Sequence, residues 1–322
     1  MKLLCILIGS VIALVSCGVE QTYNLPAPEK EDISSFNEGP VTQHTFWETG
    51  TVRDVCACKD GRHLIMATTA YAEHYDIYLM KPNSFALTQV TFTESDERFP
   101  RFSPADDGTI AFASNVQGEW DIFVAKVDEA RNCNNWTKIS ERGWDDICPS
   151  WSRDATKIIY SSTRNWDKWV LKMYDLIEKK NISFEIEGLM PDWSPTSDLI
   201  VFQKMRERDN WYSGIWLAEY SDGALHDVKC LFSPHDWAAI NPSWSPDGKQ
   251  ILFTSVGRSK ERKHLIDEGD DIHILDLDTG EVVRVTQSVS AEWLPRWSQD
   301  NRIYFISKRH NTENVFSLSS PA

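Results

Sequence analysis

The sequence predicts an all-β chain that folds as a six-bladed β-propeller. A short phrase recurs six times after residue 50, and each copy is followed by apolar runs of strand length. No long amphipathic helical pattern interrupts these runs. A period of roughly 40–50 residues is typical of architectures in which each copy forms one supersecondary unit. Four short strands per copy, joined by tight turns, describe one propeller blade.

The recurring phrase consists of Pro, one variable residue, an aromatic residue, Ser and a turn. It is clearest in PSWSPDG, and its six copies occupy residues 54–61, 100–108, 149–155, 191–198, 242–248 and 295–301. The aromatic residues of the phrase, which we call anchors, are Phe102, Trp151, Trp193, Trp244 and Trp297. The first copy is degenerate, because Ala57 stands at the position of the anchor. We expect Pro to open a strand, where its missing N–H is harmless. Trp has the area to fill the wedge between blades, and Asp-Gly tolerates a tight turn.

Three further strand-like runs follow the turn in most copies. In the fifth copy they are QILFTS, DIHILDL and VVRVTQ, at 250–255, 271–277 and 282–287. The sixth copy ends after its third strand, NVFSL, whereas a spare strand-like segment, VTQHTFW at 41–47, precedes the first copy. We expect residues 41–47 to supply the outer strand of the last blade, because this would join the chain ends and remove an open sheet edge.

The N-terminal residues have the pattern of an export signal. Lys2 precedes an apolar run from Leu3 to Val15 that is too short to span a bilayer of about 30 Å, so residues 1–16 are predicted to be a signal peptide. Residues 14–17, Leu-Val-Ser-Cys, resemble the lipobox of bacterial lipoproteins, which implies a diacylglycerol on Cys17. The alternative is an ordinary signal peptide in which Cys17 is incidental.

Three regions follow from these patterns. They are the signal peptide (1–16), a lipid-anchored Cys17 with a polar, flexible tether (17–40), and a single propeller domain (41–322). The expected location is the bacterial cell envelope, on the periplasmic side or the cell surface. Val19 is not an acidic retention residue, which favours the outer membrane slightly.

No cofactor or metal site is predicted. Cys56 and Cys58 lie two apart on one face of a strand, but no further Cys or His accompanies them at zinc spacing. Cys133 and Cys148 flank the junction between two blades, and whether they form a disulfide is left open.

The repeat resembles that of TolB-type propellers. Residues 244–255, WSPDGKQILFTS, are similar to the family's WD-like consensus, and the resemblance extends over residues 50–318. It implies the fold and a cell-envelope setting, since TolB works there with a peptidoglycan-associated lipoprotein. TolB itself carries an α/β domain before its propeller, which we do not expect in the thirty or so residues after Cys17. The chain is therefore interpreted as a relative of TolB.

Aromatic and charged residues gather in the loops between blades and in the loops between second and third strands, which a propeller places on one face. We predict a binding face there, made of Trp144, Trp237, Trp293, Asp145, Asp146, Asp236, Glu292, Trp166, Trp211, Arg164 and Arg206. Such residues bind a peptide through aromatic anchors and charge pairs, or a sugar chain by stacking. The alternative is that several of these Trp residues only cap the blades.

Charge and motifs limit the classes of function that the sequence allows. A net charge of −15 argues against nucleic-acid binding, which needs a basic surface. The favoured hypothesis is a non-catalytic scaffold, tethered to the membrane, that binds another envelope protein. The alternative is a carbohydrate- or polysaccharide-binding propeller. A glycan lyase or hydrolase using carboxylates such as Asp145 and Asp146 is less favoured, although enzymatic activity is left open.

Overall fold

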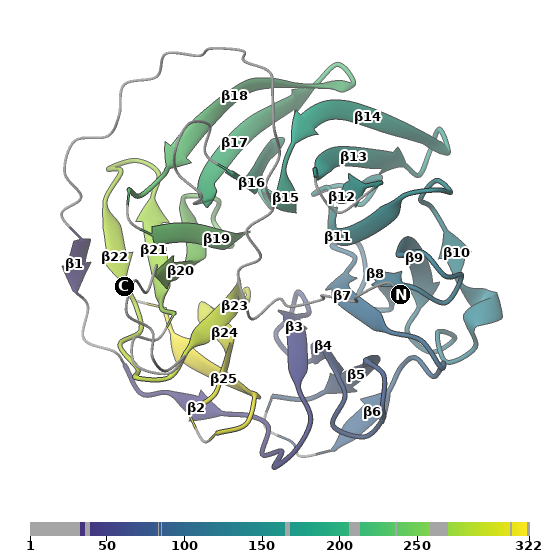
Figure 1. Cartoon of the computed structure of the whole chain (residues 1–322), viewed down its shortest axis with the longest axis horizontal. Helices are drawn as coiled ribbons and strands as arrows, with labels where there is room; N and C mark the ends of the chain where they lie inside the picture. Colours follow the sequence, from purple (N-terminus) through teal and green to yellow (C-terminus); the bar gives the residue numbers. More distant parts are fainter. Residues whose placement is uncertain are drawn as a thin grey trace.

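Six antiparallel sheets are arranged around a central axis in the computed structural model (Figure 1). The structure describes residues 33–35 and 39–320, apart from 83, 85, 165–167, 206–212, 236, 258–269 and 310. Each sheet contains four antiparallel strands, and one sheet carries a fifth strand at its edge. The predicted six-bladed, four-stranded propeller is confirmed.

The strands of each blade follow one another from the axis outward. Blade 1 comprises β3 (Val52–Ala57), β4 (Leu64–Thr68), β5 (Asp76–Met80) and β6 (Leu87–Gln89). Blade 2 comprises β7 (Glu97–Phe102), β8 (Thr109–Ser114), β9 (Asp121–Lys126) and β10 (Thr137–Lys138), with the short 3-10 helix η1 (Cys133–Asn135) before β10. Blade 3 comprises β11 (Asp145–Trp151), β12 (Lys157–Thr163), β13 (Val170–Asp175) and β14 (Lys180–Glu187).

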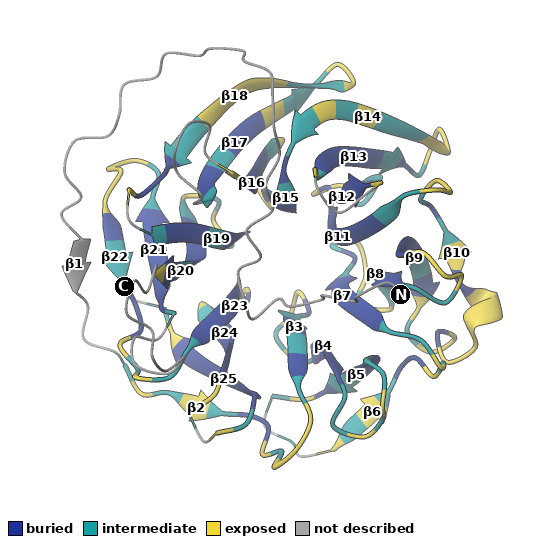
Figure 2. Ribbon diagram, viewed as in Figure 1, coloured by how far each residue is buried: buried dark blue, intermediate teal, exposed yellow. Residues whose placement is uncertain are grey.

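The second half of the ring repeats this order. Blade 4 comprises β15 (Leu189–Trp193), β16 (Leu199–Met205), β17 (Ser213–Ser221) and β18 (Ala224–Phe232). Blade 5 comprises β19 (Trp237–Trp244), β20 (Gln250–Gly257), β21 (Ile272–Asp276) and β22 (Val282–Arg284), and blade 6 comprises β23 (Glu292–Trp297), β24 (Arg302–Ser307), β25 (Asn314–Ser319) and β2 (Thr42–Gln43). Buried residues dominate the inner strands, whereas outer strands such as β14 and β18 expose more of theirs (Figure 2).

The N-terminal segment closes the ring as predicted. β2 pairs antiparallel with β25, with Thr42 opposite Ser317 and Gln43 opposite Phe316, and thus supplies the outer strand of blade 6. A further strand, β1 (Ile33–Ser35), pairs in parallel with β22 at the outer edge of blade 5. It lies within the segment assigned to the tether, most of which is outside the described residues.

Strand direction gives the propeller two different faces. We call the side that carries the hairpins between first and second, and between third and fourth, strands the turn face. The opposite side, which carries the loops between second and third strands and those between blades, is called the loop face. The predicted binding residues belong to the loop face.

Every innermost strand contains a bulge at the same place. The pairing with the second strand shifts by one residue in all six blades. One residue of each bulge has a positive φ between 53° and 61°, and these residues are Asp54, Phe99, Cys148, Met190, Asn241 and Leu294. In five blades the Pro of the phrase follows directly. The expectation that Pro opens the strand was wrong, because Pro instead lies at the bulge, where the ladder requires no N–H donor.

The six bulge residues are all buried and close the centre of the propeller. Cys148 Sγ lies 2.9 Å from Met190 Sδ of the next blade. Burial raises the pKa of the Cys148 thiol, and the charges of Asp54 in blade 1 and Arg296 in blade 6 also act on it across the axis. Phe99, Cys148, Met190 and Leu294 belong to one cluster of buried apolar residues, and we call these bulge residues the central plug.

The anchor Trp residues tie neighbouring blades together, as their size predicts. Trp151 Nε1 donates to the Arg101 carbonyl of the preceding blade (3.1 Å), and Trp244 Nε1 donates in the same way to the Asp192 carbonyl (2.9 Å). Trp193 is equally buried, but its Nε1 has no hydrogen-bond partner among the described residues. The wedge is thus filled at each of these junctions, with or without this hydrogen bond.

This difference between equivalent anchors gives a first prediction. Trp151→Phe keeps most of the buried area but leaves the Arg101 carbonyl without its donor, so the free energy of unfolding should fall by about 1–2 kcal/mol. The matched variant Trp193→Phe removes the same buried ring atoms but loses no such bond, so it should cost about 1 kcal/mol less than Trp151→Phe. Urea unfolding of the two variants measures both values, and equal losses would show that the indole bond contributes nothing.

Candidate functional site

On the loop face, Trp144 is the predicted residue that keeps a partly exposed ring with charged neighbours. It lies just before β11, and its ring is contacted by Arg164 (4.2 Å to the centroid) and by Lys172 Nζ (3.7 Å). Lys172 also pairs with Glu141 at 3.2 Å. The loop-face site therefore contains cation–π contacts already made within the chain, which orient Trp144.

Of the other two predicted Trp residues, Trp237 is half-buried and Trp293 is buried. Trp237 stacks nearly parallel to Phe253 (6.2 Å, 14°) and also lies against His273 (5.4 Å). Trp293 is 9% exposed, with Arg53 at 5.9 Å and Lys308 at 5.8 Å from its ring. Both residues thus contribute strongly to the packing of blades 5 and 6. Trp166, Trp211, Arg206 and Asp236, as well as Cys17, lie outside the described residues.

Two of the predicted carboxylates, Asp146 and Glu292, are buried, whereas Asp145 is half-buried. Asp146 and Glu292 are both 0% exposed, and Asp145 accepts the Trp120 backbone N–H at 3.0 Å. Glu292 pairs with Arg309 (2.6 Å), whereas neither carboxylate oxygen of Asp146 has a hydrogen-bond partner among the described residues. Asp146 lies between two blades, since the charge of Asp121 in blade 2 and that of Lys172 in blade 3 both act on it.

Three blade junctions share this arrangement of buried acids. The backbone N–H groups of Glu97, Asp146 and Glu292 donate to carbonyls of the preceding blade (2.6, 2.7 and 2.7 Å). The acceptors are the carbonyls of Tyr75, Trp120 and Asp270. Each of these residues is followed directly by a second acid at the start of the third strand, and these second acids are Asp76, Asp121 and Asp271. Sequence reasoning missed the third-strand acids, although each of these three runs begins with the same Asp-Ile pair.

Burial changes the titration of these acids. It raises the pKa of Glu97 to about 8, with the Asp76 charge adding to the effect, and raises the pKa of Asp146 to about 7. It also raises the pKa of Asp271 to about 6, despite the opposing charge of Arg284. Thr93 and Ser114 hydroxyls donate to one Glu97 oxygen (2.8 and 2.9 Å). Glu97 is thus held mainly in its protonated form at neutral pH, whereas Glu292, Asp121 and Asp271 form ion pairs with Arg309, Lys138 and Arg284.

The cysteines do not form the disulfide that the sequence left open. Cys133 is exposed in η1, Cys148 is buried in the central plug, and both are free. Cys58, Asp60 and Asp107 place three potential ligand atoms within 4.8 Å of one another on the turn face. The Cys58 thiol donates to Asp60 Oδ1 (2.9 Å), and burial raises the pKa of this thiol to about 11. The thiol is therefore protonated at neutral pH and stabilises the turn through this hydrogen bond.

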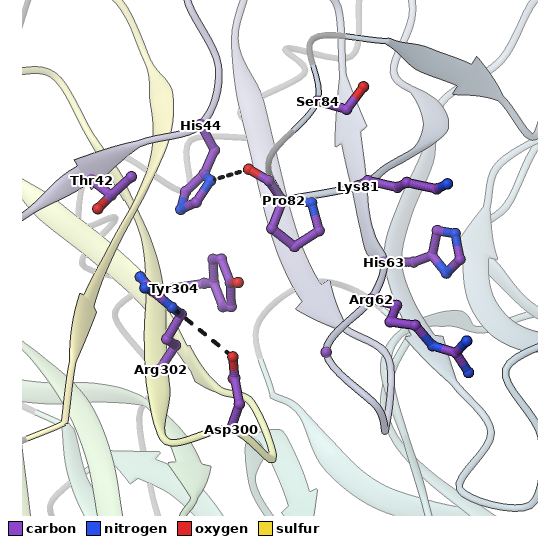
Figure 3. Close-up of a pocket in the computed structure, with 11 residues that line it drawn as sticks. Thr42, His44, Arg62, His63, Lys81, Pro82, Ser84, Asp300, Arg302 and Tyr304 are labelled. Carbon is purple, nitrogen blue, oxygen red and sulfur yellow. Dashed lines mark hydrogen bonds and ion pairs between the residues drawn. The ribbon is translucent and has the colours of Figure 1, made fainter.

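The turn face carries the larger hollow, which sequence reasoning did not find. This rim cleft, of about 530 Å³, lies between blades 6 and 1 beside β2. Arg62, His63 and Lys81 of blade 1 line one side, and Asp300, Arg302 and Tyr304 of blade 6 line the other, with His44 at one end (Figure 3). The basic residues Arg62, His63 and Arg302 each closely follow a first hairpin turn, which was the signal available in the sequence.

Cationic groups outnumber acidic ones in the rim cleft. Arg62, Lys81 and Arg302 line the cleft together with one carboxylate, Asp300, which lies 4.0 Å from Arg302. Arg62 itself pairs with Asp60, which is not among the lining residues. His44 adds no charge at neutral pH: Nδ1 contacts the Pro82 carbonyl (2.7 Å), Nε2 contacts Ser317 Oγ (2.8 Å), and burial lowers its pKa. The lining of this cleft thus carries more cationic than acidic groups, in a protein of net charge −15.

A smaller hollow lies at the centre of the same face. This mouth pocket, of about 160 Å³, is lined by the ends of innermost strands, including Arg101, Asp192 and Arg296, and by the anchors Trp193, Trp244 and Trp297. The turn of blade 6 separates the two hollows, since Gln299 lines the mouth pocket and Asp300 the rim cleft. The rim cleft and the mouth pocket therefore both open on the turn face.

Comparison with known proteins places the chain by fold. No family model and no curated protein matches the sequence. Among solved structures, a putative TolB from Agrobacterium tumefaciens has 16% sequence identity and a TM-score of 0.60, covering 86% of this chain and 93% of its own. These values establish a TolB-like propeller fold.

Propellers with other names are equally similar. An oligogalacturonate lyase from Vibrio parahaemolyticus has 13% identity and a TM-score of 0.60, covering 91% of this chain and 96% of its own. XC5397 from Xanthomonas campestris, described as a gluconolactonase, has 10% identity and a TM-score of 0.63, covering 88% and 90%. Identity this low carries the fold alone. No helix among the described residues is long and apolar enough to cross a membrane.

Proposed function

We propose that this protein is a non-catalytic scaffold of the bacterial cell envelope that binds an acidic protein partner on its turn face. The observation that carries the proposal is the rim cleft, in which Arg62, Lys81 and Arg302 meet one lining carboxylate in a chain of net charge −15. Complementary charge steers a partner to such a patch and sets its orientation. The resemblance of the repeat to TolB-type propellers supports the same setting.

Catalysis by paired carboxylates has less support. Glycosidic chemistry uses two carboxyl groups about 5–10 Å apart in one pocket. The rim cleft and the mouth pocket each hold one carboxylate among their described lining residues, Asp300 and Asp192. Asp146, a candidate from the sequence, is fully buried. Membrane attachment through Cys17 belongs to the proposal, since it would hold the propeller near a partner in the envelope.

The test is a pull-down from envelope extract that compares two charge-reversed proteins. Arg62→Glu with Lys81→Glu reverses two exposed cations of the rim cleft and should reduce retention of a stoichiometric protein partner by about tenfold or more. Arg142→Glu with Lys168→Glu makes the same change of charge on the loop face, where both residues are exposed, and should leave retention unchanged.

Each other outcome would assign the function differently. Loss of the partner only in the loop-face variant would return the binding site to the surface around Trp144. Retention only on an acidic polysaccharide column, with the same dependence on Arg62 and Lys81, would replace the protein partner by a glycan. Retention that does not fall between about 50 and 200 mM salt would contradict a charge-steered interface.

A further inference from the structure

The mouth pocket collects buried charges from blades that are far apart in the sequence. Arg101 lies near the end of β7 in blade 2, Asp192 lies in β15 of blade 4, and Arg296 lies in β23 of blade 6. The two Arg residues are each only 7% exposed. Propeller symmetry brings them together, because all three occupy the position two residues after the bulge of their innermost strand.

The positive charge of this group is not balanced among the described residues. Arg296 Nη1 lies 3.5 Å from Asp192 Oδ1, and Asp192 also accepts the Trp244 backbone N–H (2.9 Å). The other central acid, Asp54, pairs with Arg98 at 3.3 Å. Arg101 makes no ion pair with a described residue, and its Nη1 donates to the Pro100 carbonyl (2.8 Å).

A buried cation without a counter-ion, such as Arg101, is unfavourable, and a second buried cation nearby makes it more so. Burial lowers the pKa of Arg296, and the nearby Arg101 charge lowers it further. A buried charge is normally paired or bound to a ligand of opposite sign. A single negative charge bound in the mouth pocket, next to the remaining N–H groups of Arg101, would therefore stabilise the protein.

We propose that the mouth pocket is a carboxylate-binding site in which Arg101 and Arg296 hold one carboxylate group. The guanidinium fork matches the planar carboxylate with two parallel hydrogen bonds. Trp193, Trp244 and Pro246 give the pocket apolar walls for the carbon stem of the group. The site is independent of the partner proposed for the rim cleft, because it needs neither Arg62 nor Lys81.

Size and charge define the ligand more closely. A volume of about 160 Å³ is below the roughly 300–1,000 Å³ of ordinary small-molecule sites, so only a few non-hydrogen atoms enter. Asp192 remains in the wall and opposes a doubly charged phosphate, whereas a monoanion restores neutrality with Arg101. The carboxylate comes either from a small free acid or from the C-terminus of a bound peptide.

The first experiment titrates sodium acetate against sodium chloride at equal ionic strength and follows thermal unfolding of the full chain. Acetate should raise the midpoint of the wild type above its value in chloride, as expected for a ligand of the native state. Arg101→Gln should weaken acetate binding about tenfold or more, while its midpoint in chloride stays equal to or above that of the wild type. A structural arginine would instead lower the midpoint when replaced.

The matched control is Arg302→Gln, which removes a cation from the rim cleft on the same face. It should leave the acetate response unchanged, whereas an equal response in wild type and Arg101→Gln would overturn the proposal. Paired N-acetylated glycine peptides, with a free or an amidated C-terminus, distinguish the two sources. Stabilisation by the free peptide at lower concentration than acetate assigns the pocket to a peptide terminus, and the reverse order assigns it to a small acid.

A second readout uses the wild-type protein alone and needs no variant to fold. Cys56 lines the mouth pocket and is partly exposed, whereas Cys133 is exposed on the outside of blade 2. Bound acetate should slow alkylation of Cys56 by iodoacetamide several-fold and leave Cys133 unaffected, as peptide mapping would measure. Equal rates at Cys56 in acetate and chloride would contradict occupation of the pocket.

Discussion

Deleting residues up to Trp47 is expected to lower the free energy of unfolding by about 5 kcal/mol, because it reopens the propeller ring. Beyond the short pairing of β2, His44 N donates to the Val315 carbonyl (2.8 Å), and Thr45 Oγ1 accepts the Val315 N–H (2.9 Å). Asn314 accepts from Thr45 Oγ1 and from the Trp47 N–H (2.8 and 2.9 Å). Each such bond contributes about 0.5–1.5 kcal/mol.

The measurement is urea unfolding of chains that begin at residue 39 and at residue 48. The first retains β2 and should differ little from the chain with β1, because β1 is a short strand added to an outer edge. The second leaves blade 6 with three strands and an open edge, and a loss of about 5 kcal/mol is a large part of a typical stability of about 5–15 kcal/mol. A stable, monomeric chain beginning at residue 48 would show that closure by β2 is dispensable.

A point substitution tests the same contact more gently. Asn314 is 1% exposed and joins Thr45 to Trp47, so Asn314→Ala leaves buried partners unsatisfied and should cost about 2–3 kcal/mol. Its effect should largely vanish in the chain that begins at residue 48, because the partners are already absent. Full additivity of the two changes would contradict a direct link between Asn314 and the N-terminal segment.

Raising the pH from 6.5 to 8.5 is expected to lower the free energy of unfolding by about 2–3 kcal/mol. The native protein holds protons on Glu97 (pKa about 8) and Asp146 (pKa about 7), whereas the unfolded chain releases them near pH 4. The stabilisation is complete at low pH and disappears as the pH rises through the folded values. His273 and His44, whose pKa values burial lowers, act in the opposite direction only below about pH 6.5.

Urea midpoints across this interval test the prediction, with Glu97→Gln as the matched variant. The amide keeps the shape and accepts the hydrogen bonds from Thr93 and Ser114, but it has no proton to lose. The change in its free energy of unfolding over the interval should therefore be about 2 kcal/mol smaller than that of the wild type. An unchanged slope in Glu97→Gln would mean that the carboxyl is ionised in the folded protein.

The sequence predicted the surroundings of Trp144 correctly but not the burial of two predicted carboxylates. Trp144 was recognised because a large aromatic residue recurs just before an innermost strand, and it does lie on the loop face with Arg164. Asp146 and Glu292 were placed on that face by their position in loops, but their side chains point between blades and are buried. Distance from the anchor in the sequence does not give the direction of a side chain on a bulged strand.

The number of blades, the anchors and the closing strand could all be predicted from the chain, because each depends on a pattern within one copy of the repeat or on a count of copies. The groups that meet at the axis and between blades could not be predicted in this way. Arg101, Asp192 and Arg296 are each ordinary residues in their own copies, and the ring brings them into one pocket. Circular closure places equivalent positions of separate blades side by side, so the charge balance at the centre depends on all six copies together.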